Sequence, residues 1–96
     1  MPADATDRAA ILTRLRQLLA ERLGLVLDGT LEESTDLLGQ GIGLDSVEVL
    51  QLVSAIEEAY ALTIDDDDLQ REHFATLGTV VTFVAERLQR PERVRP

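Results

Sequence analysis

The sequence has no cysteine, no lysine and a single histidine, His73. Without cysteine it has no disulfide framework and no cysteine-ligated zinc or iron–sulfur site, and a lone histidine lacks a partner for a histidine-based metal site. No apolar run approaches the ~20 residues of a membrane-spanning helix, and the first ten residues lack the apolar stretch of a signal peptide. We therefore expect a soluble, cytoplasmic protein with no resident metal.

The chain is short, and this limits its architecture. Its 96 residues, of which 45% are hydrophobic and 28% charged, are enough for one small globular domain. A chain of this size buries only about 60–65% of its unfolded surface, which leaves no room for an enzyme with a deep cleft. We place the domain at residues 7–90 and expect residues 1–6 and 91–96 to be flexible ends.

Acidic residues are concentrated in the middle of the chain. The net charge is −9, and between Arg22 and Arg71 there are 12 acidic residues and no basic residue. Such a segment repels nucleic acid and anionic membranes and attracts basic protein surfaces. The alternative is that the acidity serves solubility alone. We expect a protein partner and no nucleic-acid or membrane partner.

The hydrophobic residues follow helical spacing. Residues 7–23 predict an amphipathic helix, capped by Thr6 or Asp4 and ended by Gly24. Residues 25–44 contain four glycines and several turn-forming residues, and they predict a long loop. The apolar residues expected to hold this loop against the core are Leu25, Val26, Leu37, Leu38 and Leu44.

A second helix is predicted to begin at Asp45–Ser46, where Asp45 and Glu48 form a capping-box pattern. Its predicted core stripe consists of Val49, Leu52, Val53, Ile56 and Tyr60, and Val47 and Leu50 lie outside that stripe. A short third helix is predicted at residues 66–72, opened by the acids 65–68. The last helix is capped by Thr76, and its stripe is Leu77, Val80, Val81, Val84 and Leu88; Pro91 ends it. The prediction is an all-α, small four-helix bundle with three long helices, one short helix and a long loop between the first two.

Few residues are suited to catalysis. A serine–histidine–aspartate triad would need His73, and no serine lies in a G-x-S-x-G turn. Residues 39–43 are rich in glycine but lack the strand and later glycine of a nucleotide-binding loop. The acids 65–68 lack the spacing of a calcium loop. We interpret His73 as a packing or surface residue and Tyr60 as a core residue, and we expect a protein that is not an enzyme.

Ser46 occupies an unusual position, directly after a glycine-rich loop and an N-capping aspartate. Its hydroxyl should lie near the surface in the first helical turn, with no general base nearby in the sequence. It is therefore a poor nucleophile by itself but a good acceptor for a group that another enzyme attaches. A phosphate there would lie at the positive end of the helix. The alternative is that Ser46 only helps to cap the helix.

The segment from Gly43 to Glu48 resembles the attachment motif of acyl carrier proteins. The resemblance covers about residues 7–89 and includes Asp36–Leu37, Val53 to Glu58, Ile64 with the acids after it, and Phe74-x-Thr76-Leu77. It implies that Ser46, next to Asp45, carries 4′-phosphopantetheine, transferred from coenzyme A by a Mg²⁺-dependent phosphopantetheinyl transferase. The thiol of that arm then holds acyl groups as thioesters. The chain would be a covalent carrier, consistent with its lack of cysteine.

The resemblance also implies a docking surface on the second helix for basic patches of partner enzymes. The positions that match this surface are Val47, Glu48, Leu50, Gln51, Glu57 and Glu58. The partners implied are the transferase, an acyltransferase or ligase, and a ketosynthase or other biosynthetic enzyme, and the carrier is expected to be a monomer.

Val47, Gln51 and Ser54 depart from the family's commoner residues, which favours polyketide or related specialised biosynthesis. The alternatives are a housekeeping fatty-acid carrier, a stand-alone peptidyl or aminoacyl carrier, or, more distantly, an unmodified acidic helical adaptor. In the last case Ser46 would carry no group, so the mass of the protein after exposure to coenzyme A and transferase separates the adaptor from the carriers.

Overall fold

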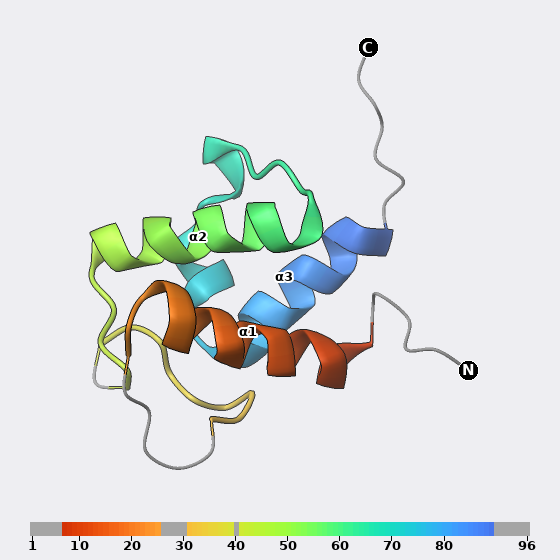
Figure 1. Ribbon diagram of the computed structural model, residues 1–96. Coiled ribbons are helices and arrows are strands. Elements are labelled where there is room, and N and C mark those ends of the chain that lie inside the picture. Colours follow the sequence, from red (N-terminus) through yellow and green to blue (C-terminus); the bar gives the residue numbers. More distant parts are fainter. Residues whose placement is uncertain (1–6, 26–30, 40, 90–96) are drawn as a thin grey trace.

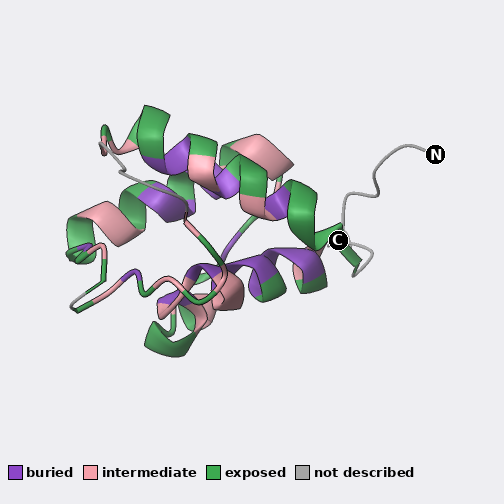
Figure 2. Ribbon diagram, turned by 90° about the horizontal axis from the view of Figure 1, so that it is seen from below, coloured by how far each residue is buried: buried purple, intermediate pink, exposed green. Residues whose placement is uncertain are grey.

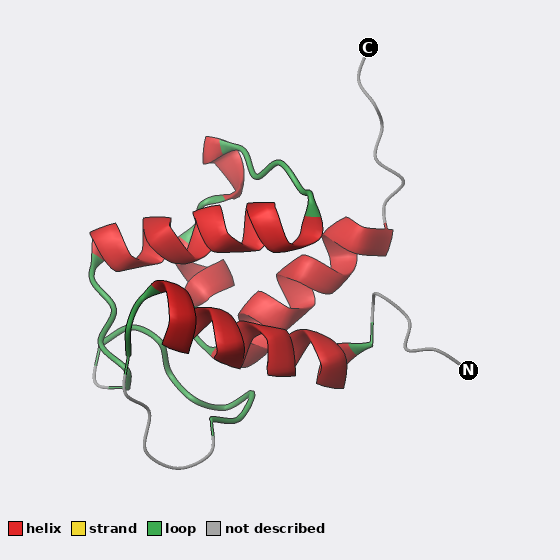
Figure 3. Ribbon diagram, in the orientation of Figure 1, coloured by secondary structure: helices red, strands yellow, loops and turns green. Residues whose placement is uncertain are grey.

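The computed structural model describes residues 7–25, 31–39 and 41–89. Within these residues the chain forms three α-helices, α1 (Arg8–Arg22), α2 (Ser46–Tyr60) and α3 (Leu77–Gln89), and no strand (Figures 1 and 3). The prediction of an all-α chain is thus confirmed for the described residues. Val26 and the ends predicted to be flexible, 1–6 and 91–96, lie outside these residues. The last residue described is Gln89.

The first helix forms where its hydrophobic spacing predicts it, but its cap is different. Asp7 is the N-cap, and its Oδ1 accepts a hydrogen bond from the Ala9 amide at 2.9 Å. The prediction of Thr6 or Asp4 as the cap was therefore wrong, and both residues lie outside the described ranges. At the other end Gly24 adopts a φ of 68°, which glycine tolerates better than other residues, as the prediction of a terminating glycine requires.

The last helix begins with a reciprocal pair of threonines. The Thr79 amide donates to Thr76 Oγ1 and the Thr76 amide donates to Thr79 Oγ1, each at 3.1 Å. The predicted cap at Thr76 is confirmed, and the partner hydroxyl of Thr79 satisfies a second backbone group at the same helix end. The helix ends at Gln89.

The short third helix predicted at residues 66–72 is replaced by two 3₁₀ turns, Asp66–Asp68 and Arg71–Phe74. The carbonyls that a continuous α-helix would use accept hydrogen bonds from side chains instead. Gln70 Nε2 donates to the Asp67 carbonyl at 3.2 Å, and His73 Nδ1 lies 2.9 Å from the Asp68 carbonyl. Local side-chain hydrogen bonds of this kind compete with formation of a continuous α-helix, so the predicted short helix, and with it the four-helix bundle, is not confirmed in this segment.

The core lies where the three helices meet. α1 packs against both α2 and α3, and the buried faces of the helices point toward one another (Figure 2). Leu37 and Leu44 of the long loop are buried in this core, and Leu25 and Leu38 pack against it, as predicted. The fully buried large side chains are Ile11, Leu15, Leu19, Leu37, Leu52, Ile56, Leu77, Val80, Val81 and Val84.

Candidate functional site

The N-terminus of α2 is closed by the predicted capping box. Asp45 has an extended backbone (φ −91°, ψ 179°), and its Oδ1 accepts a hydrogen bond from the Glu48 amide at 2.8 Å. Glu48 Oε1 in turn accepts a hydrogen bond from the Asp45 amide at 3.1 Å. Because each side chain satisfies a backbone donor of the other residue, the first turn of α2 is fixed in position without help from its serine.

Ser46 is the first residue of α2, and it is exposed. Its hydroxyl makes no hydrogen bond to another residue in the described parts of the chain, so no neighbouring base activates it. A serine in this setting is an accessible acceptor rather than a self-activated nucleophile. The capping function that could have occupied Ser46 belongs to Asp45.

The loop before Ser46 is held by backbone hydrogen bonds to the start of α3. The Leu37 amide donates to the Ala75 carbonyl at 2.8 Å, and the Leu77 amide donates to the Thr35 carbonyl at 3.0 Å. The Leu44 amide then donates back to the Leu37 carbonyl at 2.8 Å. These hydrogen bonds place the chain at Leu44, two residues before Ser46, against the rest of the fold.

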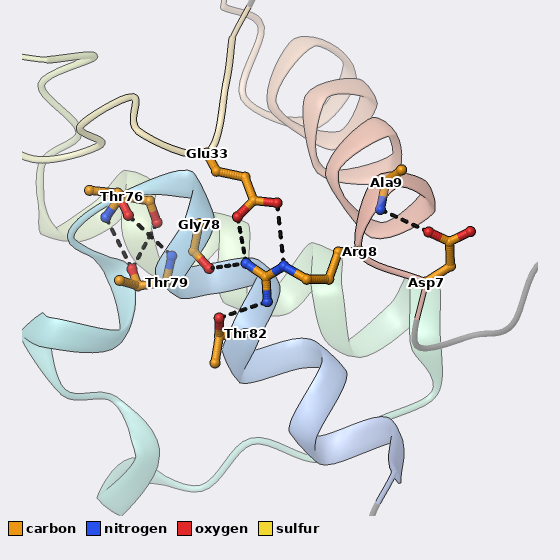
Figure 4. A network of polar contacts seen from close by, with 8 residues as sticks. All are labelled: Asp7, Arg8, Ala9, Glu33, Thr76, Gly78, Thr79 and Thr82. Carbon is orange, nitrogen blue, oxygen red and sulfur yellow. Dashed lines mark hydrogen bonds and ion pairs between the residues drawn. The ribbon is translucent and has the colours of Figure 1, made fainter.

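The side chain of Arg8 also holds this loop, through Glu33 (Figure 4). The Arg8 guanidinium contacts three residues on two segments: it donates to the Glu33 carboxylate of the loop at 2.6 and 3.3 Å, and in α3 to Thr82 Oγ1 at 2.8 Å and to the Gly78 carbonyl at 3.3 Å. The hydrogen bond from Arg8 holds the pKa of the Glu33 carboxyl below its usual value. Arg8 therefore ties the start of α1 to the loop and to α3.

A groove of about 360 Å³ opens beside Ser46, between the first turns of α2 and the segment that holds the 3₁₀ turns. Most of its lining is apolar, and the polar groups that line it include Ser46 itself. The apolar lining residues are Leu38, Leu44, Val49, Leu50, Leu69 and Phe74, and the polar ones are Asp45, Ser46, Gln70 and Arg71. A flexible group attached to the serine thus has an apolar surface within its reach.

The outer face of α2 presents two large apolar side chains to solvent. Val47 is 61% exposed and Leu50 is 54% exposed, as their place outside the core stripe predicts. Gln51 and Glu58 are also exposed on this helix. Exposed aliphatic side chains next to carboxylates are typical of a surface that binds another protein.

The acids of α2 are not equivalent. Glu48 belongs to the capping box, and Glu57 Oε2 accepts a hydrogen bond from the Ile64 amide at 2.8 Å. Glu58 pairs with Arg22 at the end of α1, where Nη1 and Oε1 are 2.9 Å apart. Two of the predicted docking carboxylates are therefore also structural: the capping box predicted the role of Glu48, but the spacing along the helix did not reveal that of Glu57.

His73, interpreted as a packing or surface residue, and Tyr60, interpreted as a core residue, are both half-buried, and Tyr60 packs against the core. The His73 ring stacks on Phe83, with centroids 4.9 Å apart, and its Nδ1 contacts the Asp68 carbonyl. Burial raises the pKa of Tyr60, an effect that the charge of Arg14 partly opposes. Neither side chain lines the groove beside Ser46.

The described residues 7–25, 31–39 and 41–89 contain no group of three or more histidine, cysteine or acidic side chains placed to hold a metal ion. In the acidic run, Asp68 pairs instead with Arg87 of α3. None of the helices in these ranges is long and apolar enough to cross a membrane.

Comparison with known proteins agrees with this geometry. Residues 13–84 match the family model described as "Phosphopantetheine attachment site". The chain is 32% identical over 84 residues to an acyl carrier protein of Saccharopolyspora erythraea, covering 88% of this chain and 84% of that protein. It is 34% identical over 79 residues to an acyl carrier protein of an Exiguobacterium species, covering 81% and 94%. No solved structure matches the chain.

The chain belongs to the acyl carrier protein family. Members carry 4′-phosphopantetheine and serve other enzymes without catalysing a reaction themselves, so the predictions of the prosthetic group and of a non-enzymatic carrier are confirmed. The groove residues from the turn segment, Leu69, Gln70, Arg71 and Phe74, were not predicted. They lie more than twenty residues beyond Ser46 in the sequence, and no local spacing connects them to it.

Proposed function

We propose that Ser46 is the residue to which 4′-phosphopantetheine is attached. The observation that carries this proposal is the exposed serine hydroxyl at the first position of α2, beside an aspartate that already caps the helix. The other serines are less suited. Ser34 lies in the loop before the predicted motif, and Ser54 lies within α2, where a hydroxyl is apt to bond back to a helix carbonyl.

The residues present fit such a group. The phosphate of the arm would lie at the positive end of the helix dipole, and the apolar groove next to Ser46 offers a surface for the arm and its cargo. When bound, the arm supplies a thiol that holds acyl groups as thioesters. The chain itself contributes the exposed acceptor oxygen, the fixed first turn of α2 and the groove.

We further propose that the outer face of α2 binds the partner enzymes. Val47 and Leu50 would enter apolar depressions on the partner, and Gln51 and Glu58 would lie among its basic residues. The proposed partners are a phosphopantetheinyl transferase, an acyltransferase or ligase, and a ketosynthase. The acidic segment 23–70 supports basic protein partners of this kind.

The pathway that we favour is polyketide or related specialised biosynthesis. Val47, Gln51 and Ser54 support it because they differ from the residues that are commoner in fatty-acid carriers. The alternatives are a fatty-acid carrier and a peptidyl or aminoacyl carrier. They are separated by offering the loaded protein to condensing enzymes of each kind and to an adenylating ligase, and measuring which enzyme acylates or elongates on it.

The attachment site is tested by intact mass after incubation with coenzyme A, Mg²⁺ and a transferase of broad specificity. The parent protein should gain one phosphopantetheine mass, and Ser46→Ala should gain none while its circular dichroism stays helical. Ser34→Ala and Ser54→Ala are the matched controls and should load like the parent. Loading that persists in Ser46→Ala would overturn the assignment, and a parent protein that never loads would favour the unmodified adaptor.

A further inference from the structure

Arg71 differs from every other arginine in the described residues. Each of the others donates a hydrogen bond to the protein: Arg8 to Glu33, Arg14 to Gln17, Arg16 to the Leu31 carbonyl, Arg22 to Glu58 and Arg87 to Asp68. Arg71 donates none to another described residue, although it begins a 3₁₀ turn and is exposed. Its charge is therefore available for a group from outside the chain.

The place of Arg71 indicates what that group is. Arg71 lines the groove that also contains Ser46, and among the residues that the structure describes it is the only basic one in the lining. It is also the first basic residue after the acidic stretch 23–70. Within the described part of the chain, the one cation beside the proposed attachment point thus lies across the groove from Ser46, on a different segment of the fold.

A phosphodiester on Ser46 would need compensation for its charge. It would stand next to the carboxylates of Asp45 and Glu48, which repel it. The Glu48 amide is already used by Asp45, so the helix end offers only the amides of Ser46 and Val47, which have no acceptor among the described residues. A guanidinium adds planar donors matched to phosphate oxygens, and it adds a full positive charge.

We infer that Arg71 is the counter-ion of the phosphodiester attached to Ser46, a role that depends on the proposed attachment site. The guanidinium binds the phosphate at the start of the arm, beside the groove. The start of the arm is then held in place, while the rest of the arm can enter or leave the groove. Loading of the protein then links the turn Arg71–Phe74 to the first turn of α2. Arg71 is a positioning residue for the arm and takes no part in the transfer reaction.

The test uses the full chain before and after loading. In the parent protein, loading should shift the side-chain Nε–H NMR resonance of Arg71, and the ³¹P resonance of the diester should change when Arg71→Gln is introduced. Arg71→Lys should keep part of the ³¹P shift because it keeps the charge. Arg14→Gln is the matched control, since it removes the same charge from a residue that does not line the groove. The difference between Arg71→Gln and the parent should shrink in 0.5 M salt.

Loading itself is measured first by intact mass, so two failures can be told apart. A parent protein that gains no phosphopantetheine would contradict the proposed attachment, and the inference with it. Loaded protein with the same ³¹P resonance in the parent, Arg71→Gln and Arg14→Gln would leave the attachment intact and overturn the role of Arg71. An equal change of the ³¹P resonance in Arg71→Gln and Arg14→Gln would also overturn the role of Arg71. It would indicate that the resonance responds to the net charge of the protein and not to an ion pair between Arg71 and the phosphodiester.

Discussion

The Glu57 carboxylate accepts a hydrogen bond from the Ile64 amide, at 2.8 Å. Ile64 is buried, and its backbone lies just beyond the end of α2, where Ala61 takes a left-handed conformation with a φ of 55°. Glu57 therefore fastens the segment that leaves α2 back onto the helix. Its neighbour Glu58 is exposed and pairs with Arg22 at the surface.

This difference predicts unequal costs for two identical substitutions. Glu57→Ala leaves the Ile64 amide without its acceptor, which should lower the free energy of unfolding by about 1–3 kcal/mol. Glu58→Ala breaks a surface ion pair and should cost at most about 1 kcal/mol. Urea unfolding of both variants at the same pH measures the difference. Equal midpoints would show that the Glu57 hydrogen bond contributes nothing beyond a surface contact.

The exposed aliphatic pair on α2 predicts where partner binding is sensitive. Val47→Asp or Leu50→Asp should lower kcat/KM for loading by about tenfold, the effect of about 1.4 kcal/mol at an interface anchor. Stability should change by less than about 0.5 kcal/mol because both side chains are exposed. Steady-state kinetics with the transferase measure the effect. Ala20→Asp adds the same charge at an exposed site on α1 and should load normally; equal slowing by all three would contradict the docking surface.

The capping box predicts that two adjacent residues have opposite roles. Asp45→Ala removes the side chain that holds the Glu48 amide and should cost about 1 kcal/mol of stability. Ser46→Ala removes an exposed hydroxyl without a described protein partner and should cost less than about 0.5 kcal/mol. Thermal unfolding of the unloaded variants checks this order. A greater loss from Ser46→Ala would mean that the serine, and not the aspartate, caps α2.

The features that the sequence predicted correctly are mostly local. The capping box joins residues three apart, and the exposure of Val47 and Leu50 follows from the helical period, so both could be read from spacing. The short third helix is not confirmed as one continuous α-helix, because seven residues are too few to show a clear hydrophobic period. There the side chains of Gln70 and His73 compete for the backbone carbonyls.

Contacts between distant parts of the chain could not be predicted in this way. Arg8 contacts Glu33 and Thr82, which lie 25 and 74 residues away, and Arg71 reaches the groove of Ser46 from another segment. These partners depend on how the helices pack, which no spacing within one helix specifies. The serine of the proposed site could be predicted from the sequence, but the residues that surround the serine could be identified only from the folded structure.

Gly41 predicts a steric limit in the loop before Ser46. A Cβ on Gly41 would overlap the carbonyl oxygen and the Cβ of Asp36, and that oxygen accepts the Ile42 amide at 2.9 Å. Gly41→Ala should therefore break this hydrogen bond, speed hydrogen exchange at the Ile42 amide and cost about 1–3 kcal/mol. Gly39→Ala meets open space but strains a φ of 64°, so it should lose stability while Ile42 keeps its protection. Unchanged exchange at Ile42 in Gly41→Ala would contradict the close approach.

The pair between Asp68 and Arg87 predicts a dependence of stability on acid. Burial alone would raise the pKa of Asp68, but the hydrogen bond and charge of Arg87 outweigh it, with help from the Asp65 amide, and the pKa is lowered. In the unfolded chain the carboxyl has a pKa of about 3.9. The unfolded state therefore binds this proton more readily. The stability that Asp68 contributes is present above about pH 4 and is lost as the pH falls through the lowered folded pKa.

Asp68→Asn should then be less stable than the parent at pH 7, by no more than about 1 kcal/mol for an ion pair of this exposure. The difference in the free energy of unfolding between Asp68→Asn and the parent should narrow below about pH 4. At that pH the parent's Asp68 becomes protonated and loses the negative charge that the substitution has already removed. Urea unfolding at a series of pH values measures it, with Asp67→Asn, an exposed neighbour in the same acidic run, as the control. A gap between Asp68→Asn and the parent that is the same at pH 3 and pH 7 would show that the carboxylate of Asp68 does not stabilise the fold through its charge.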